Sequence, residues 1–261
     1  MTTMRTSLQR NMKGWIQPFL LCFALLALWQ LMVTGRVWDS TIVPSPIRTV
    51  AAAWEFRTVL ARDFVVTSAE VSLGFLVTVS ASLTAAIMLH LLKGRLRGFY
   101  GLLIVLQSVP LWAIAPVLFY WTGPGLTTRL LVIVLTAFFP VLVNTVEGLR
   151  RIDQELSDVF DSMNAGVWQK LYRLEIPSVL YMVLAGSQVT LTMCLIGAVL
   201  AEMLVGDMVG LGYRIKAANA HFRIDLVFAS VALLGVIVAL FYSGLALLAR
   251  RFDPSSSTKE S

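Results

Sequence analysis

Long apolar segments separated by polar stretches are the feature that most restricts how this chain folds. Six of them are long enough to cross a hydrocarbon core of about 30 Å, which takes about 20 residues of helix. A backbone in lipid has to satisfy its own hydrogen bonds, so each crossing is expected to be a helix. The predicted spans are 15–33, 64–92, 102–121, 128–146, 178–205 and 226–248. The sequence therefore predicts an all-α integral membrane protein with six transmembrane helices.

Composition points to a membrane protein rather than a soluble one. Hydrophobic residues make up 57% of the 261 residues and charged residues only 14%, whereas a soluble domain has about 25% charged residues. The net charge of +6 comes from basic residues at the ends of apolar segments, so we interpret them as topology signals and expect no nucleic-acid partner. We expect one membrane domain, residues 15–249, in contact with lipid.

The distribution of Lys and Arg predicts which side of the membrane each loop occupies. With the N-terminus in the cytoplasm, 13 of the 21 basic residues fall inside and 8 outside, as the positive-inside rule requires. Residues 1–14 and 250–261 are therefore predicted to be cytoplasmic. The first apolar run follows basic residues, as in a signal peptide, but no small-x-small cleavage site comes after it. We interpret it as an uncleaved first helix.

Prolines mark local features between and inside the spans. Ser45 and Pro46 suit the cap and the first turn of a helix. Residues 47–62 continue at helical spacing, which predicts a short amphipathic helix on the outer membrane surface. Three further prolines are expected to kink the third and fourth spans, because each removes a backbone donor: Pro110, Pro116 and Pro140.

One long polar stretch, residues 147–177, interrupts the apolar pattern, and we call it the polar segment. Apolar residues recur in it at i, i+3, i+4 and i+7, which predicts an amphipathic helix with one stripe: Leu156, Val159, Phe160 and Met163. Asn164 to Gly166 then favour a helix end, because Asn and Gly adopt a left-handed φ most readily. A second short helix follows before Pro177. The segment either lies on the membrane surface or docks on a partner, and its complete stripe favours docking.

The polar segment resembles the cytoplasmic EAA loop of ABC importer permeases. Asp158-Val159-Phe160 stand at the Glu-Ala-Ala positions of that loop, Asn164 at its glycine, and Ile176-Pro177 at its closing apolar-Pro pair. The sequence departs from the family pattern at the first four of these positions. Asn is the best replacement for a glycine with positive φ, and Asp158 still offers a carboxylate on a shorter arm.

The resemblance extends over nearly the whole chain. Several motifs are similar to those of the branch that imports nitrate, sulfonates, taurine and aminopyrimidines: residues 43–46, 72–75, 107–110, 115–116, 138–145 and 210–213. Residues 173–178 and 196–202 are similar, more weakly, to permeases for thiamine-precursor pyrimidines and riboflavin-like compounds. The fold that the resemblance implies is the type I ABC importer permease fold, with a cytoplasmic coupling helix in the polar segment.

The resemblance also implies the partners. Such permeases work in pairs, so we expect a second permease copy in a homodimer, two P-loop ATPase subunits and an extracytoplasmic substrate-binding protein, in a bacterial inner membrane. ATP and Mg are expected on the ATPase, because this chain has no G-x-x-x-x-G-K-[ST] and no hydrolase signature. The chain is expected to be a transport subunit and not an enzyme, with no cofactor, catalytic residue or metal site of its own.

Candidate site residues fall in two groups. The resemblance implies an ATPase-coupling surface, for which we select Asp158, Phe160, Asp161, Met163, Asn164 and Gly166. Polar or aromatic residues within the spans are candidates for the translocation pathway, because polar groups are costly in lipid and usually face a bundle interior: Gln107, Ser108, Trp112, Asn144, Gln188, Thr192 and Glu202. The alternative for residues of the second group is that they form hydrogen bonds between helices. For Phe160 the alternative is packing within this chain, and for Glu202 it is a position at the membrane interface.

The remaining polar signals are weak. Cys22 and Cys194 lie in apolar segments and are expected to be buried, and His90 and His221 have no metal-ligand neighbours in the sequence. The loop 206–225 either meets the binding protein or only connects two spans.

Two other classes of protein fit the sequence less well. An ion-coupled secondary transporter is expected to have buried charge pairs at mid-membrane and two related halves, and an intramembrane enzyme a catalytic constellation within the spans. The sequence shows none of these. Within the importer class the solute is expected to be small and polar. A thiamine-precursor aminopyrimidine or a riboflavin-like compound is favoured, and sulfonate, taurine or nitrate is the alternative.

Overall fold

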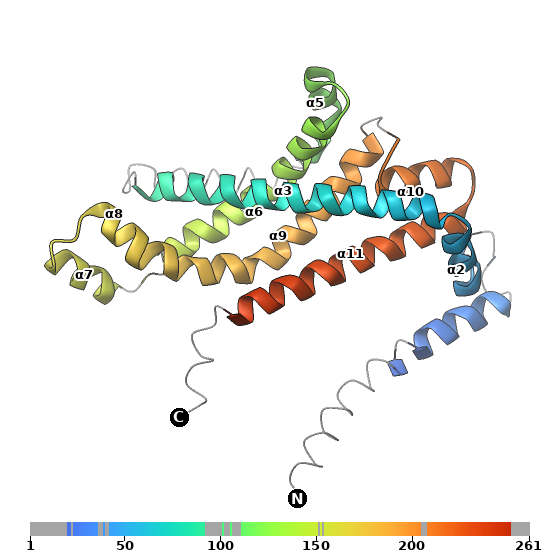
Figure 1. Ribbon diagram of the computed structural model, residues 1–261, viewed down its shortest axis with the longest axis horizontal. Coiled ribbons are helices and arrows are strands. Elements are labelled where there is room, and N and C mark those ends of the chain that lie inside the picture. The colour runs from blue at the N-terminus through green and yellow to red at the C-terminus, as the bar shows by residue number, and fades with distance from the viewer. Residues whose placement is uncertain are drawn as a thin grey trace, which may run out of the picture. The chain divides into compact units, whose positions relative to one another are not determined.

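In a computed structural model of the chain, the described residues are 20–21, 23–35, 39, 42–91, 101, 105, 111–150, 152, 154–204 and 208–251. The regular elements in these ranges are all helices, without a strand (Figure 1). Four of the described helices are long and apolar enough to cross a membrane: Arg57–Leu91, Leu126–Arg150, Ser187–Leu204 and Ile224–Leu245. The chain is therefore a multi-pass helical membrane protein.

These four helices correspond to the second, fourth, fifth and sixth predicted spans. They belong to α3 (Arg57–Leu91), α6 (Leu126–Arg150), α9 (Ile176–Leu204) and α11 (Ile224–Arg251). The first predicted span holds a shorter apolar helix, Phe23–Thr34. Of the third span, the structure describes residue 105 and the stretch from 111 onward, where a 3₁₀ turn, η1 (Leu111–Ile114), leads into α5 (Ala115–Thr122). Six spans with both ends cytoplasmic stay a prediction, because residues 1–14 and 252–261 lie outside the described ranges.

The start of α3 differs from the prediction, which placed residues 47–62 in one surface helix and began the second span at 64. α2 (Pro46–Glu55) is followed by its C-cap residue Phe56, and α3 begins at the next residue, Arg57. Charged residues lower the hydropathy of residues 57–63, so hydropathy alone leaves them out of the span. A helix forms its own backbone hydrogen bonds whatever its side chains are, so the polar start and the apolar run make one helix of 35 residues. At about 1.5 Å per residue, α3 exceeds the hydrocarbon core of about 30 Å.

The prolines act at different places in their helices. Pro140 lies inside α6, which continues through it. Pro116 lies in the first turn of α5, where a missing backbone N–H is tolerated. It therefore marks a helix start, and the expected kink within a continuous helix is wrong for this residue. Pro110 lies outside the described residues.

The chain forms two compact units. One combines residues 1–60 with 215–232, and the other combines residues 61–214 with 233–261. The boundaries fall inside α3, α10 (Leu211–Ala220) and α11, so each unit contains parts of the same three helices.

The smaller unit contains α2, whose start confirms the sequence prediction. Ser45 caps this helix, with its Oγ accepting a hydrogen bond from the Arg48 N–H at 3.3 Å, and Pro46 is the first helical residue. An apolar stripe of exposed side chains runs along it: Ile47, Val50 and Trp54. The stripe makes α2 amphipathic, as expected, and its place on the outer membrane surface stays a prediction.

Arg223 joins the two segments of the smaller unit. Its Nη2 lies 3.2 Å from Glu55 Oε2, its Nε lies 3.0 Å from Asp225 Oδ1, and its guanidinium carbon lies 5.0 Å from the centre of the Phe56 ring. The hydrogen bond to Asp225 is the main cause that raises the pKa of this guanidinium. The contacts link the end of α2 to the start of α11.

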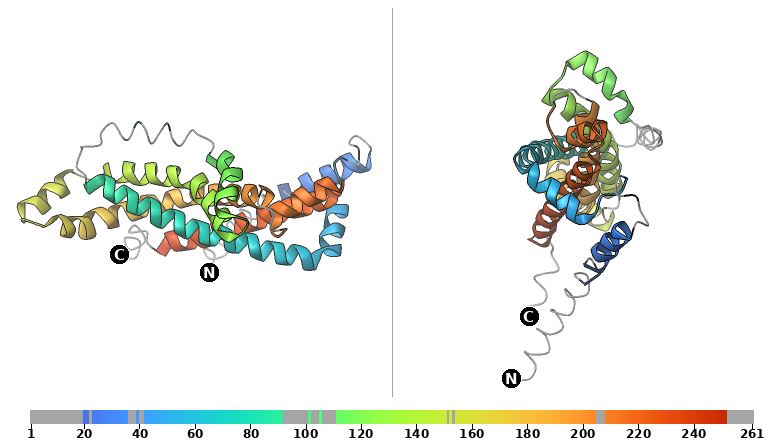
Figure 2. Two further views of the ribbon diagram at one scale, coloured as in Figure 1. Left: turned by 90° about the horizontal axis from the view of Figure 1, so that it is seen from above. Right: turned by 90° about the vertical axis from the view of Figure 1, so that its right-hand side faces the viewer.

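The larger unit is built around α6 and α9, which pack along each other with α3 beside them (Figures 1 and 2). Ile133 on α6 is fully buried. A Cβ at Gly74 of α3 would lie 2.4 Å from Ile133 Cγ2, and one at Gly197 of α9 would lie 2.9 Å from Ile133 Cα. Small residues therefore let the three helices approach closely, as in other membrane bundles. Cys194 on α9 is buried, as predicted, and Cys22 lies outside the described residues.

Candidate functional site

The polar segment folds as the predicted helix, break and helix. α7 (Gln154–Ser162) is followed by α8 (Val167–Lys170), a π-helical turn η2 (Leu171–Glu175) and, without interruption, α9. α7 and α8 extend past the nearby ends of α3 and α6 (Figures 1 and 2). The first half of the segment is therefore presented away from the long helices of its own unit.

Hydrogen bonds across the break fix the end of α7. The Ala165 N–H donates to the Phe160 carbonyl at 3.0 Å and the Asn164 N–H donates to the Asp161 carbonyl at 3.1 Å, which is the Schellman arrangement. Asn164 has φ 58°, the left-handed conformation predicted for it. Gly166 has φ −62°, which any residue adopts. The break therefore depends on the conformation of Asn164.

An ion pair joins the two helices of the polar segment. Lys170 Nζ lies 2.9 Å from both carboxylate oxygens of Asp161. A partly exposed pair of this kind contributes about 0.2–1 kcal/mol. At the start of α8, the Gly166 N–H donates to Gln169 Oε1 at 3.2 Å. These contacts restrict how α7 and α8 are angled about the break.

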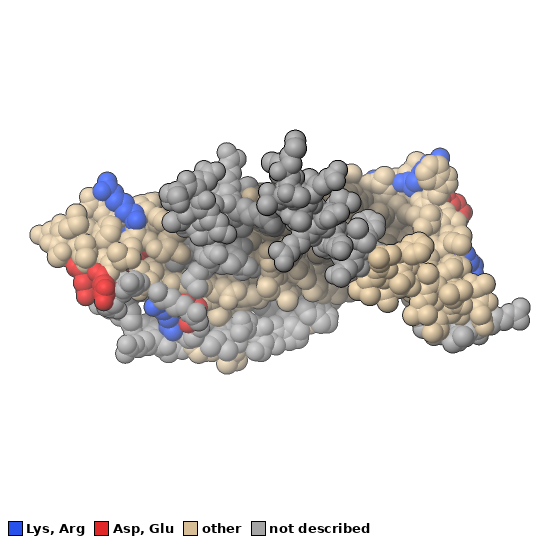
Figure 3. Space-filling model, turned by 90° about the horizontal axis from the view of Figure 1, so that it is seen from below, with Lys and Arg blue, Asp and Glu red and all other residues tan. Residues whose placement is uncertain are grey.

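Several large apolar side chains of the polar segment are exposed. Met163, Trp168 and Tyr172 are 73%, 63% and 64% exposed, and the last two rings stack with centroids 6.2 Å apart. Leu156 and Val159 are about half exposed. Acidic and basic side chains gather at the end of the unit that α7 and α8 form (Figure 3). An apolar surface with a charged rim is typical of a protein–protein interface.

The residues selected for coupling lie on or next to this surface. Asp158, Asp161 and Met163 are exposed, whereas Phe160 is half-buried. The selection missed Trp168 and Tyr172, although their spacing of four places them on one helix face and is readable in the sequence. The coupling role of all these residues stays a prediction.

The second half of the polar segment is held by its own unit. Leu171, Leu174 and Glu175 are buried. Glu175 Oε1 lies 3.2 Å from Nε2 of His90, which stands one residue before the end of α3. The pair joins η2 to α3 across 85 positions of sequence. A contact at this separation cannot be predicted from the spacing of residues in the sequence. π-helical turns such as η2 occur frequently at functional positions.

The predicted pathway residues lie on different helices. Asn144 on α6 and Thr192 on α9 are exposed, Gln188 is half-buried, and Glu202 is buried. The Thr192 hydroxyl donates to the Gln188 carbonyl at 3.1 Å within α9. The side chains of the remaining three lie outside the described part of the chain: Gln107, Ser108 and Trp112. A place in the pathway stays a prediction for all seven.

A buried ion pair joins α3 to α6. Arg129 Nη1 lies 2.5 Å from Glu70 Oε1, and the two side chains are 8% and 3% exposed. Arg129 is the fourth residue of α6, so the pair lies near the start of that helix, and the expectation about charge pairs at mid-membrane stays a prediction. The sequence places Arg129 beside a short loop, but α6 begins at Leu126, so the guanidinium lies within a helix next to α3. Removing either partner of such a pair leaves the other charge buried and unpaired, which strongly destabilises the folded protein.

A comparison with protein families identifies the class of this chain. Residues 78–258 match the family described as the inner membrane component of binding-protein-dependent transport systems. The chain belongs to this family and is a permease subunit of an ABC importer. The resemblance inferred from the polar segment and the other motifs is therefore confirmed.

Known relatives match over most of the chain. It is 30% identical to a probable ABC transporter permease of Haemophilus influenzae over 237 residues, which cover 91% of this chain and 96% of the relative. It is 27% identical to the formylaminopyrimidine transport permease ThiX of Halalkalibacterium halodurans, over 89% of this chain and 93% of that protein. Other relatives are named for the transport of aliphatic sulfonates, riboflavin, taurine and nitrate.

A solved structure shares the fold. A chain of the MetNI methionine ABC transporter, in an inward-facing form, matches with a TM-score of 0.65 and 16% identity, over 76% of this chain and 98% of that chain. This likeness supports the expected type I importer permease fold.

Proposed function

We propose that the chain is one of two permease copies in an ATP-driven importer, and that its polar segment is the coupling helix that docks on an ATPase subunit. The observation that carries the proposal is the exposed apolar surface of Met163, Trp168 and Tyr172, in a segment that extends past α3 and α6. Membership of the importer permease family supports it.

The docking surface combines apolar anchors with a fixed turn. Met163 and Trp168 enter a groove of the ATPase, because exposed aromatic and Met side chains are common anchors at interfaces. Asp158 is exposed and offers a carboxylate to the partner. Asn164 sets the turn, and Asp161 holds α7 against α8 through its ion pair.

The ATPase subunit binds ATP and Mg and drives the cycle. Because η2 continues directly into α9, displacement of the polar segment enters the membrane helices through α9. A ligand shifts a conformational equilibrium only by binding one state better than the other. ATP on the ATPase and a loaded binding protein on the outside therefore favour the outward-open state together. The proposed location is a bacterial inner membrane, with the polar segment and both chain ends in the cytoplasm.

The translocation pathway runs between the two permease copies in this proposal. Asn144 and Thr192 are exposed polar residues within spans, which favours contact with solute or with the second copy over contact with lipid. Gln188 lies one helical turn from Thr192 on α9. An ion-coupled secondary transporter is the remote alternative, and the family match argues against it.

The solute is proposed to be small and polar. Relatives named for formylaminopyrimidine and riboflavin transport support a thiamine-precursor aminopyrimidine or a riboflavin-like compound. Relatives named for sulfonate, taurine and nitrate transport support the alternative within the same importer class.

Reconstitution tests the proposed function. The permease, its ATPase and its binding protein are placed in proteoliposomes, with the solute chosen by thermal-shift screening of the binding protein. We expect the loaded binding protein to raise ATP hydrolysis several-fold over the empty binding protein, and uptake of labelled solute to require ATP. Uptake by the permease alone, driven by an ion gradient without nucleotide, contradicts the proposal and favours the secondary transporter.

A further inference from the structure

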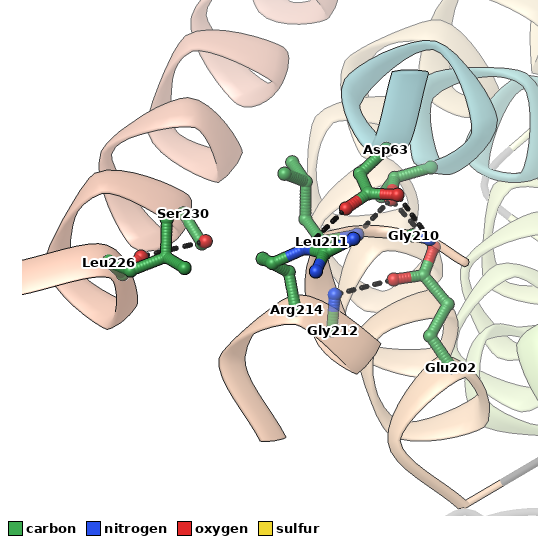
Figure 4. A network of polar contacts seen from close by, with 9 residues as sticks. Asp63, Glu202, Gly210, Leu211, Gly212, Arg214, Leu226 and Ser230 are labelled. Carbon is green, nitrogen blue, oxygen red and sulfur yellow. Dashed lines mark hydrogen bonds and ion pairs between the residues drawn. The ribbon is translucent and has the colours of Figure 1, made fainter. Parts of the chain in front are cut away.

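Three consecutive backbone N–H groups at the start of α10 are bound by side chains of other helices (Figure 4). The Gly210 N–H donates to Asp63 Oδ1 at 3.2 Å, the Leu211 N–H donates to Thr67 Oγ1 at 2.9 Å, and the Gly212 N–H donates to Glu202 Oε2 at 2.6 Å. The first two acceptors lie on α3 and the third on α9. The first N–H groups of a helix normally bind water or a neighbouring cap residue. At the start of α10, side chains of α3 and α9 bind them instead.

The same side chains also bind one another. The Thr67 hydroxyl donates to Glu202 Oε1 at 2.6 Å, and Arg214 Nε donates to Asp63 Oδ2 at 2.8 Å. Both carboxylates are 1% exposed. Each of their four oxygens thus has a donor, as a buried carboxylate requires. We call this set of contacts the latch, formed by Asp63, Thr67, Glu202, Arg214 and the N–H groups of residues 210–212.

Two glycines let the start of α10 reach the latch. Gly210 has φ 101°, and a Cβ there would lie 2.3 Å from the carboxyl carbon of Glu202. A Cβ at Gly212 would lie 2.5 Å from the Val199 carbonyl oxygen. Any larger residue at either position displaces the carboxylate or the backbone of α9. The latch therefore requires both glycines of this turn.

We propose that the latch keeps α3, α9 and the start of α10 together as one rigid body during the transport cycle, so that α9 carries displacement of the polar segment to α3. This inference rests on the proposed function. Opening the latch leaves two buried carboxylates and three N–H groups without partners, which a low-dielectric interior penalises strongly. During the cycle, helix interfaces that lack such contacts rearrange instead, because packed elements switch between discrete arrangements rather than deform continuously. Glu202 and Thr67 are positioning residues in this account.

Hydrogen exchange tests whether the latch stays closed. The complete complex of permease and ATPase, in nanodiscs, is compared without nucleotide and trapped with ATP and vanadate. We expect the amides of residues 210–212 to exchange slowly in both states, within about two-fold of each other, while other peptides change. A rise of ten-fold or more in the exchange rate of residues 210–212 in one state contradicts the rigid latch but leaves the proposed function unaffected. If no peptide responds to ATP, the proposed function fails and the inference falls with it.

A spin label tests whether the latch positions α3. Val65 lies on α3 between the two latch residues of that helix and is 64% exposed. It is changed to Cys in a background with Cys22→Ser and Cys194→Ala, and the distance between the labels of the two copies is measured with and without ATP and vanadate. We expect Thr67→Ser to keep the ATP-dependent shift and Thr67→Val to lose at least half of it. An unchanged shift in Thr67→Val, with the variant folded and binding the ATPase, overturns the positioning role.

Discussion

Asn164 sets the geometry of the polar segment through one dihedral angle. Its φ of 58° closes the Schellman bonds that end α7 and turns the chain into α8. Asn tolerates this conformation because its short polar side chain makes few clashes, whereas a branched side chain does not.

Replacing Asn164 by Val is expected to weaken docking on the ATPase. The left-handed conformation costs most residues about 1–2 kcal/mol, which corresponds to a loss of affinity of about 5–30-fold if docking requires the turn. Asn164→Gly is expected to bind like the wild type. The measurement is the dissociation constant between permease and ATPase in detergent.

Gly166 offers the matched control for this substitution. A Cβ there meets nothing within 4 Å, and its φ of −62° suits alanine. Gly166→Ala is therefore expected to bind like the wild type. Equal losses in Asn164→Val and Gly166→Ala would show that the segment tolerates no change at either position, and the φ of Asn164 would then not be the cause of the loss.

Gly210 is a second residue whose identity the contacts dictate. Gly210→Ala places a methyl group against the Glu202 carboxyl at a φ of 101°, so we expect a fall of several degrees in the melting temperature of the purified permease. Gly235→Ala is the control, because a Cβ at Gly235 on α11 meets nothing within 4 Å. It is expected to melt at or slightly above the wild-type temperature. A stable Gly210→Ala variant would contradict the described position of Glu202.

At the scale of elements, α8 adds exposed apolar side chains, Val167 and Trp168, to those of α7. Trp168→Ala removes one ring of the stacked pair with Tyr172. Truncation of a central aromatic anchor typically costs about 2 kcal/mol or more, so we expect ATPase affinity to fall by a factor of about 30. Trp54→Ala, at a Trp that is 72% exposed on α2, serves as the control and is expected to bind normally. Loss of affinity in the control alone would place the docking surface on α2.

The ion pair between α3 and α6 yields a prediction about stability. Arg129→Ala leaves the Glu70 carboxylate buried without its cation, and breaking a buried pair in this way costs about 3–5 kcal/mol. The double variant Glu70→Leu with Arg129→Met removes both charges and is expected to recover most of the lost stability. Thermal unfolding in detergent measures both. A double variant that melts as low as Arg129→Ala would mean that the charges have a role beyond pairing.

Hydropathy and local residue chemistry predict some elements well and miss others. The cap at Ser45, the left-handed Asn164 and four long apolar helices follow from signals within a few residues. The predicted second span begins at residue 64, seven residues after the start of α3, because charged residues such as Asp63 lower the hydropathy of this stretch. The partner of Asp63, Arg214, lies 151 positions away, and Thr67 and Glu202 are 135 positions apart. Contacts at such separations leave no periodicity in a single sequence.

On the scale of the whole chain, polar contacts connect the polar segment to distant parts of the larger unit. His90 and Glu175 join α3 to η2 at one end, and the latch joins α3 to α9 and α10 near the other end of α3. An importer permease has to carry the movement of its ATPase across the membrane, and helices tied at both ends suit that task.

Cross-linking from the polar segment to the ATPase tests the central claim most directly. In the background without native cysteines, Met163→Cys, 73% exposed, carries a short photoactivatable label, and Ile47→Cys on α2, 68% exposed, carries the same label as control. We predict that Met163→Cys captures the ATPase subunit in membranes, that ATP and vanadate change the yield, and that Ile47→Cys captures none. Capture from Ile47→Cys but not from Met163→Cys, or labelling of Met163→Cys by an impermeant reagent added from outside the cell, would contradict the account.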